Sequence, residues 1–229
     1  MGGESLGEFF TATFRMHKEK PAITFLRDGK VETEISYLEL HQDTNRMANT
    51  FLDRGIKKGD RVILFIQKSL IFVVAHLALQ KIGAIAVPLN AGFKKSELQY
   101  LLCDAEAGLI VSGPEKEALI RSIDPNLRNL IIDTQKPYRD QDILCPASED
   151  FTSLEIRPDD PGLIIYTSGT TGKPKGAILT HKNLIHDARN IINIWEISDS
   201  DVLCHALPFF HVHGLCFALH TSLLAGAHV

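Results

Sequence analysis

The middle of the chain alternates short, wholly apolar runs with segments of helical periodicity, and this alternation restricts the fold more than any other feature. Strands without a polar face are buried on both sides, as in a parallel sheet covered by helices. The sequence therefore predicts an α/β fold with a parallel, doubly wound sheet layered with helices. The predicted strands are 61–66, 84–87, 109–111 and 130–132, and the predicted helices are 70–82, 96–104 and 115–122.

The flanking segments carry local signals of their own. Asp28-Gly29 predicts a hairpin between strands 22–25 and 31–35. Ser36 and Glu39 form a capping-box pattern for a helix that runs to about Arg54. Residues 134–161 are polar and rich in proline, which favours a long surface connection. The remaining predicted elements are helices 6–16, 180–194 and 214–224, with Gly226 ending the last, and strands 162–166 and 201–206.

Composition excludes several classes of protein. The 229 residues are 45% hydrophobic and 23% charged, which is ordinary for a soluble globular protein. A net charge of −4 implies no general attraction to nucleic acid or to an anionic membrane. We expect no transmembrane segment and no signal peptide, and hence a cytoplasmic protein. The four cysteines lack CxxC spacing, which favours reduced thiols over disulfides or zinc ligands.

A run of hydroxyl, glycine and lysine residues, TSGTTGKPKG, follows the predicted strand 162–166 and occupies residues 167–176. Glycines let backbone N–H groups approach an anion closely, hydroxyls donate hydrogen bonds, and lysines supply positive charge. A loop after a strand is where α/β proteins place phosphate-binding backbone. The run is not a Walker A motif, because Gly169 and Gly172 enclose two residues rather than four. The sequence therefore predicts a polyphosphate-binding loop of another kind; the alternative is a solvated polar loop.

This run closely resembles the signature loop of the adenylate-forming superfamily, which includes acyl-CoA synthetases, luciferases and peptide-synthetase adenylation domains. Three further segments resemble family elements in the expected order: SYLEL at 36–40, KIGAIAVPLN at 81–90 and LPFFHVHG at 207–214. The resemblance covers nearly the whole chain. It implies that residues 1–229 form the N-terminal part of the large AMP-binding domain, with the remainder and a C-terminal lid domain absent.

The resemblance implies an acyl-CoA synthetase reaction. ATP activates a carboxylic acid to an acyl-adenylate with release of pyrophosphate, and the acyl group then passes to coenzyme A. Mg²⁺ would bridge phosphate oxygens, as hard cations do, and no protein metal site is expected. The family's catalytic Lys, ribose-binding Asp and Mg²⁺-binding Glu would lie beyond Val229, so we expect the chain alone to be inactive.

The implied site residues fall in two of the matching segments. His211 is the implied catalytic residue, able to donate a hydrogen bond to a carboxylate or to developing charge; the alternative is a core histidine beside two phenylalanines. Lys175 is the implied electrostatic partner of the phosphates. Lys173 is expected to point to solvent, although a contact with the phosphates stays open. The implied nucleotide-binding residues are Thr167, Ser168, Gly169, Thr170, Thr171, Gly172 and Lys175.

The sequence indicates the identity of the carboxylic acid substrate less clearly than the type of reaction. The segment FHVHGL at 210–215 is similar to malonyl-CoA synthetase-type members, which slightly favours a short dicarboxylic acid over a fatty acid. Two alternatives to an acyl-CoA synthetase stay open. One is another adenylating enzyme, such as an aryl-acid or peptide-synthetase adenylation domain; the other is a fragment that binds nucleotide without catalysis. The sequence gives no indication of oligomeric state.

Overall fold

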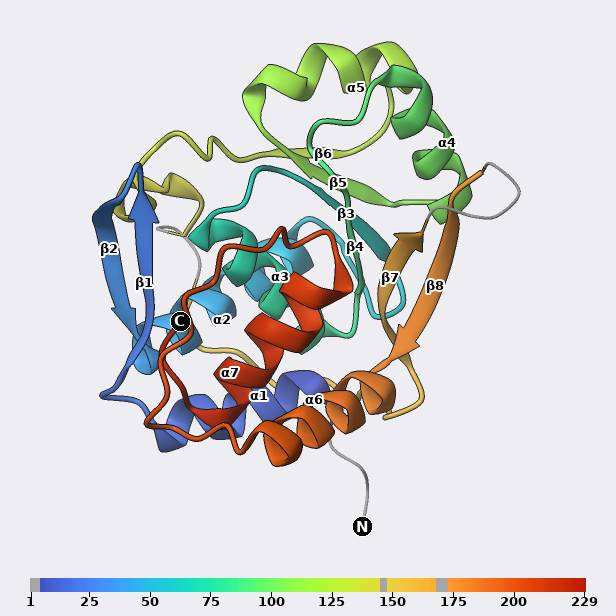
Figure 1. Ribbon diagram of the computed structural model, residues 1–229. Helices are drawn as coiled ribbons and strands as arrows, with labels where there is room; N and C mark the ends of the chain where they lie inside the picture. Colours follow the sequence, from blue (N-terminus) through green and yellow to red (C-terminus); the bar gives the residue numbers. More distant parts are fainter. Residues whose placement is uncertain (1–4, 145–147, 168–172) are drawn as a thin grey trace.

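A six-stranded sheet with the strand order β6-β5-β3-β4-β7-β8 forms the centre of the molecule in the computed structural model, which describes residues 5–144, 148–167 and 173–229 (Figure 1). The strands from β6 to β7 pair in parallel, which confirms the predicted parallel arrangement. β8 pairs antiparallel to β7 and makes the sheet mixed. The strands are β3 (Arg61–Phe65), β4 (Ile85–Pro88), β5 (Leu109–Ser112), β6 (Asn129–Ile131), β7 (Pro161–Thr167) and β8 (Lys175–Thr180).

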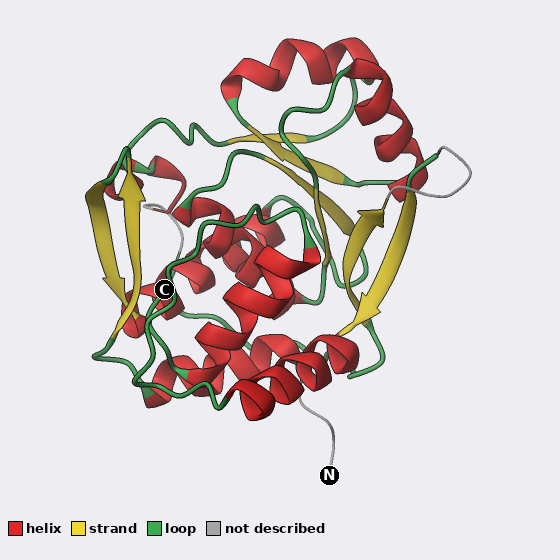
Figure 2. Ribbon diagram, viewed as in Figure 1, coloured by secondary structure: helices red, strands yellow, loops and turns green. Residues whose placement is uncertain are grey.

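Helices cover both faces of the sheet, so the predicted doubly wound layering is confirmed (Figure 2). Alternation along β3 divides its side chains between the two cores, with Val62 and Leu64 in one and Ile63 and Phe65 in the other. The smaller core is closed by α4 (Lys95–Ala105) and α5 (Glu117–Ile123). The larger is closed by α1 (Leu6–Met16), α2 (Tyr37–Asp53), α3 (Leu70–Ile82), α6 (His181–Trp195) and α7 (Thr221–Ala225).

The helix α3 lies at the centre of the larger core, and every one of its residues is buried. Its sequence is apolar on nearly all sides, which suits a helix packed between a sheet and other helices. The helix ends at Gly83, whose φ of 68° is in the left-handed region. None of the helices in the described part of the chain is long and apolar enough to cross a membrane.

The predicted local signals before the sheet are confirmed. β1 (Pro21–Arg27) and β2 (Lys30–Ser36) form an antiparallel hairpin. Its turn residues Asp28 and Gly29 have φ of 51° and 75°, as a tight hairpin turn requires. In α2 the Ser36 and Glu39 side chains each accept from the other's backbone N–H, which completes the predicted capping box.

Two predictions near the end of the chain need correction. Residues 201–206 do not form a strand, because their pairing in the described part of the chain is limited to an isolated parallel bridge between Val202 and His228. The helix predicted from Gly214 begins as a π-helix, His213–His220, which runs directly into α7. Gly226, with a φ of 76°, ends it as predicted. The connection before β7 contains two short 3₁₀ turns, Tyr138–Asp140 and Asp142–Leu144.

Candidate functional site

The predicted phosphate-binding run begins at the end of β7 and finishes in the first residues of β8. Thr167 is the last residue of β7 and pairs with Lys175, the first residue of β8. The Thr167 hydroxyl donates a 3.4 Å hydrogen bond to the Lys175 carbonyl, and both residues are exposed. The remaining predicted nucleotide-binding residues, Ser168, Gly169, Thr170, Thr171 and Gly172, lie outside the described residues. The structure thus brings together the two ends of the run.

Helix α4 holds both sides of this hairpin. On β7, the Tyr166 hydroxyl donates a 2.6 Å hydrogen bond to the Asp104 carboxylate. On the other side, the Tyr100 hydroxyl donates a 3.0 Å hydrogen bond to the Pro174 carbonyl. The Lys173 ammonium lies 5.7 Å from the centre of the Tyr100 ring, so this exposed lysine has an aromatic neighbour. Partial burial, together with the Asp104 carboxylate, raises the pKa of Tyr166, which therefore remains a hydrogen-bond donor at neutral pH.

The predicted catalytic segment is a loop whose orientation depends on one buried aromatic side chain. Phe209 is buried and stacks on Phe72 of α3 with ring centres 5.2 Å apart. His211, two residues further along, is exposed, so the alternative of a core histidine is wrong. A large buried aromatic side chain contributes roughly 2–3 kcal/mol to folding. Phe209 therefore holds the loop against α3 while His211 stays accessible.

Lys68, between β3 and α3, fastens the same loop to the sheet. Its ammonium donates a 2.6 Å hydrogen bond to the His205 carbonyl and lies 5.1 Å from the centre of the Phe209 ring. The His205 ring nitrogen Nε2 donates a 2.7 Å hydrogen bond to the Gly214 carbonyl, which closes the loop onto the start of the π-helix. These contacts join residues 205–214 to the carboxyl end of β3.

The two predicted site segments consequently lie at the same edge of the sheet. Lys68 follows β3 and Thr167 ends β7, and both strands are parallel to β4, which separates them. Adjacent strands are about 4.8 Å apart, so the ends of β3 and β7 are separated by about 10 Å. The carboxyl edge of a parallel sheet is where α/β proteins bind ligands. Loops of this separation can contact opposite ends of one nucleotide-sized ligand.

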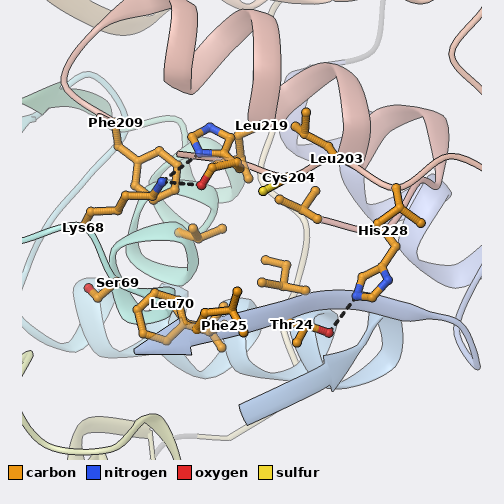
Figure 3. Close-up of a pocket in the computed structure, with 16 residues that line it drawn as sticks. Thr24, Phe25, Lys68, Ser69, Leu70, Leu203, Cys204, Phe209, Leu219 and His228 are labelled. Atoms are coloured by element: carbon orange, nitrogen blue, oxygen red, sulfur yellow. Dashed lines mark hydrogen bonds between the residues drawn. The ribbon is translucent and has the colours of Figure 1, made fainter. Parts of the chain in front are cut away.

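A cavity of about 490 Å³ lies beside the catalytic segment, between β1, the start of α3 and residues 202–209 (Figure 3). Its wall is mostly apolar, with Phe25, Leu70 and Leu219 among the lining side chains. Lys68, Cys204 and His205 are among the lining residues that add polar atoms. His211, Thr167 and Lys175 do not line it. The cavity therefore adjoins the candidate site without containing its predicted residues, and we do not assign the acid to it.

Sequence reasoning missed the residues that support the site. Tyr100 and Asp104 are four residues apart, a spacing that places them on one face of α4, but nothing in the sequence links them to the hairpin. Lys68 follows a predicted strand and has no motif around it. Among the described residues, His, Cys, Asp and Glu side chains form no cluster of three that could hold a metal ion. Cys103, Cys204 and Cys216 are free thiols, as predicted, and Cys145 lies outside the described residues.

The fold is a mixed α/β sheet covered by helices, with the two ends of the Gly-, Thr- and Lys-rich run paired at its carboxyl edge, where α/β proteins place their ligand sites. The family model described as "AMP-binding enzyme" matches residues 10–229, and the chain belongs to this family. This membership confirms the resemblance to adenylate-forming enzymes.

The chain is similar to several CoA ligases and to solved structures of this family. It is 31% identical over 248 residues to a crotonobetaine/carnitine–CoA ligase of Escherichia coli O139:H28, covering 99% of this chain and 46% of that protein. ATP-bound MatB from Rhodopseudomonas palustris superposes with a TM-score of 0.86 at 33% identity, covering 100% of this chain and 44% of that one. The inhibitor-bound N-terminal domain of FACL13 from Mycobacterium tuberculosis superposes with a TM-score of 0.82 at 25% identity, covering 100% and 57%. The chain spans about half the length of the curated relatives it matches.

Proposed function

We propose that the protein is an AMP-forming acyl-CoA synthetase, and that residues 1–229 are the N-terminal part of its large AMP-binding domain. A carboxylate oxygen of the acid attacks the α-phosphorus of ATP, and pyrophosphate leaves. The thiol of coenzyme A then attacks the acyl carbon, and AMP leaves. The observation that carries the proposal is the Thr167–Lys175 hairpin loop in a chain that matches the AMP-binding family.

The hairpin loop would hold the β- and γ-phosphates of ATP. Thr167, Ser168, Gly169, Thr170, Thr171 and Gly172 would donate hydrogen bonds from backbone N–H groups and hydroxyls. Lys175 would add a positive charge from the first position of β8. The contacts of Tyr166 with Asp104 and of Pro174 with Tyr100 support this role, because they join the residues on both sides of the run to α4 without any ligand.

His211 would act at the reacting carboxylate. Its exposure, and its place at the carboxyl edge of the sheet, support contact with the acid and the α-phosphate. A neutral imidazole can donate one hydrogen bond to the negative charge that builds up as the two anions approach. Phe209 and Lys68 are positioning residues for this histidine.

The acid, coenzyme A and Mg²⁺ belong to the proposal as co-substrates and counter-ion. Mg²⁺ prefers oxygen ligands and commonly binds through substrate phosphates. Mg²⁺ would therefore bridge phosphate oxygens of the bound ATP. The printed names of the relatives support CoA ligase chemistry, and the ATP-bound MatB structure supports ATP use. We further propose a cytoplasmic protein.

An exchange assay tests the reaction in the protein that contains this chain. Labelled pyrophosphate should exchange into ATP when the right carboxylic acid is present. The panel of acids tested includes both short dicarboxylic acids and fatty acids. Formation of acyl-CoA on adding coenzyme A separates an acyl-CoA synthetase from other adenylating enzymes. Absence of exchange with every acid in a broad panel would refute the proposal.

A matched pair of lysine variants tests the loop separately. Lys175→Ala should weaken binding of Mg·ATP about tenfold in isothermal titration, because an ion pair to phosphate is lost. Lys173→Ala should change it little, because this lysine lies over Tyr100. Equal affinities for the two variants and the unmodified protein would exclude the assigned role of Lys175.

A further inference from the structure

The structure holds a second pocket, which has a volume of about 270 Å³ and lies between α1, α2 and the end of α3. Its lining includes several polar and charged side chains, Lys81 among them. Lys81 precedes β4 and therefore lies at the amino edge of the sheet, whereas the phosphate loop follows β7 at the carboxyl edge. The pocket is thus separate from the candidate active site.

We propose that this pocket binds a small organic anion with a carboxylate or phosphate head group, held between Lys81 and Arg15.

Lys81 supplies the first support for this assignment, because it is a buried cation paired only with neutral groups. The residue is 5% exposed. Its ammonium donates a 2.7 Å hydrogen bond to the Asn45 side-chain oxygen and lies 3.2 Å from the His41 nitrogen Nδ1. No carboxylate of the described residues is hydrogen-bonded to this ammonium. A buried charge of this kind is costly unless an opposite charge accompanies it.

The other charged groups around the pocket favour an anion. Arg15 of α1 is exposed and lines the same pocket. Glu8, also on α1, uses its carboxylate to cap the helix by accepting from the Ser5 N–H. Phe151, Ser153, Leu154 and Ile156 line the pocket with uncharged side chains. Two cations thus face a pocket whose only lining carboxylate serves the helix cap.

The protonation of Lys81 makes the expected binding sensitive to pH. Burial and the neighbouring Arg15 lower the pKa of Lys81 to about 7. Burial and the Lys81 charge lower the pKa of His41 to about 4, so His41 is neutral above pH 5. The protonated ammonium form of Lys81 attracts an anion, and a bound anion in turn stabilises this protonated form. Binding is therefore strongest below pH 7 and weakens as pH rises above it.

The shape of the lining indicates an organic anion rather than a bare ion. The head group would lie at Lys81 and Arg15, with the hydroxyls of Thr11 and Ser153 available as donors. Phe151, Leu154 and Ile156 line the same pocket and would contact a short apolar body attached to the head group. A cavity of about 270 Å³ is large enough for such a molecule and too small for a whole nucleotide.

Isothermal titration with sulfate at fixed ionic strength tests the site, because sulfate keeps its charge over the range used. The protein that contains this chain should bind sulfate saturably at pH 6 and at least tenfold more weakly at pH 8.5. Lys81→Met should abolish this binding and Arg15→Gln should weaken it several-fold. Lys95→Met, which removes an exposed lysine of α4, should leave it unchanged.

A second arm separates this pocket from the nucleotide loop. Lys175→Ala should keep the sulfate site even though it weakens Mg·ATP binding. Absence of saturable binding at pH 6, full binding by Lys81→Met, or loss of binding in Lys175→Ala alone would each overturn the proposal. Benzoate and phenyl phosphate distinguish the two head groups by competition with sulfate; failure of both to compete would also overturn it.

A measurement on the unmodified protein covers the case in which Lys81→Met does not fold. In protein labelled with ¹³C-lysine, the Lys81 side-chain signal should titrate near pH 7 and shift its midpoint upward when sulfate is added. A midpoint unaffected by saturating sulfate would contradict the assignment.

Discussion

The Tyr166 hydroxyl donates a 2.6 Å hydrogen bond to the Asp104 carboxylate, which joins the end of β7 to α4. This contact fixes the strand that leads into the phosphate-binding run. It also makes α4, a helix of the smaller core, part of the support of the candidate site.

The first prediction concerns this contact. Tyr166→Phe should lower the free energy of unfolding by about 1 kcal/mol, because one hydrogen bond to a carboxylate is lost at a partly exposed position. It should also weaken Mg·ATP binding a few-fold by loosening the loop. Urea denaturation and isothermal titration measure the two effects. Asp104→Asn and the double variant complete a double-mutant cycle. The double variant should lose less free energy of unfolding than the sum of the two single losses, whereas strictly additive losses would argue against the contact.

The second prediction concerns pH. Burial lowers the pKa of His181 to about 4 and that of His220 to about 3, and burial with the neighbouring His220 lowers that of His76. Unfolded histidines titrate near 6.5, so below that pH the unfolded state binds more protons and stability falls. The melting temperature should therefore decrease between pH 6.5 and 5, before most carboxylates titrate.

Paired replacement isolates the two histidines that touch. The ring nitrogens Nε2 of His76 and His220 lie 2.8 Å apart, and both residues are fully buried. Replacing both by leucine removes the buried imidazoles together and should flatten the pH dependence, whereas replacing one leaves the other without its partner. An identical slope in the double variant would show that the loss arises elsewhere.

The third prediction compares two glycines with nearly equal positive φ angles and different surroundings. Gly29 and Gly226 have φ of 75° and 76°, so alanine is strained by about 1 kcal/mol at either position. A Cβ on Gly29 would meet nothing within 4 Å, whereas a Cβ on Gly226 would lie 2.5 Å from the His17 ring. Gly226→Ala should therefore cost about 1–3 kcal/mol more than Gly29→Ala in thermal or urea unfolding. Equal losses would mean that the His17 ring moves aside without cost.

The fourth prediction concerns the free edge of the sheet. Among the described strands, β8 is last in the order and pairs with β7 alone, and its Ile178 side chain is 60% exposed. An apolar edge strand favours pairing with another molecule. The 229-residue chain should bind a hydrophobic dye and self-associate at high concentration, and Ile178→Lys should reduce both. Analytical ultracentrifugation provides the check, with Val31→Lys on the hairpin strand β2 as the matched control. A chain that stays monomeric and dye-free would contradict the expectation.

The sequence alone determined the features that depend on neighbouring residues. Asp28-Gly29 required a hairpin turn, Ser36 and Glu39 capped α2, and the apolar run from Leu70 made α3 a buried helix. The order of apolar strands and helices was enough to predict the layered sheet, because a strand without a polar face must be covered on both sides. The signature run gave the family in the same local way.

Tertiary structure decided the features that depend on residues far apart in the chain. β8 became a strand because β7 offered a partner along its whole length, although its own side chains are mostly exposed. Residues 201–206 pair, within the described residues, only through the bridge between Val202 and His228 and form no strand. The contacts of Tyr166 with Asp104 and of Lys81 with Asn45 join positions 62 and 36 residues apart. Such contacts follow from how helices pack on the sheet, and no local pattern of residue types encodes that packing.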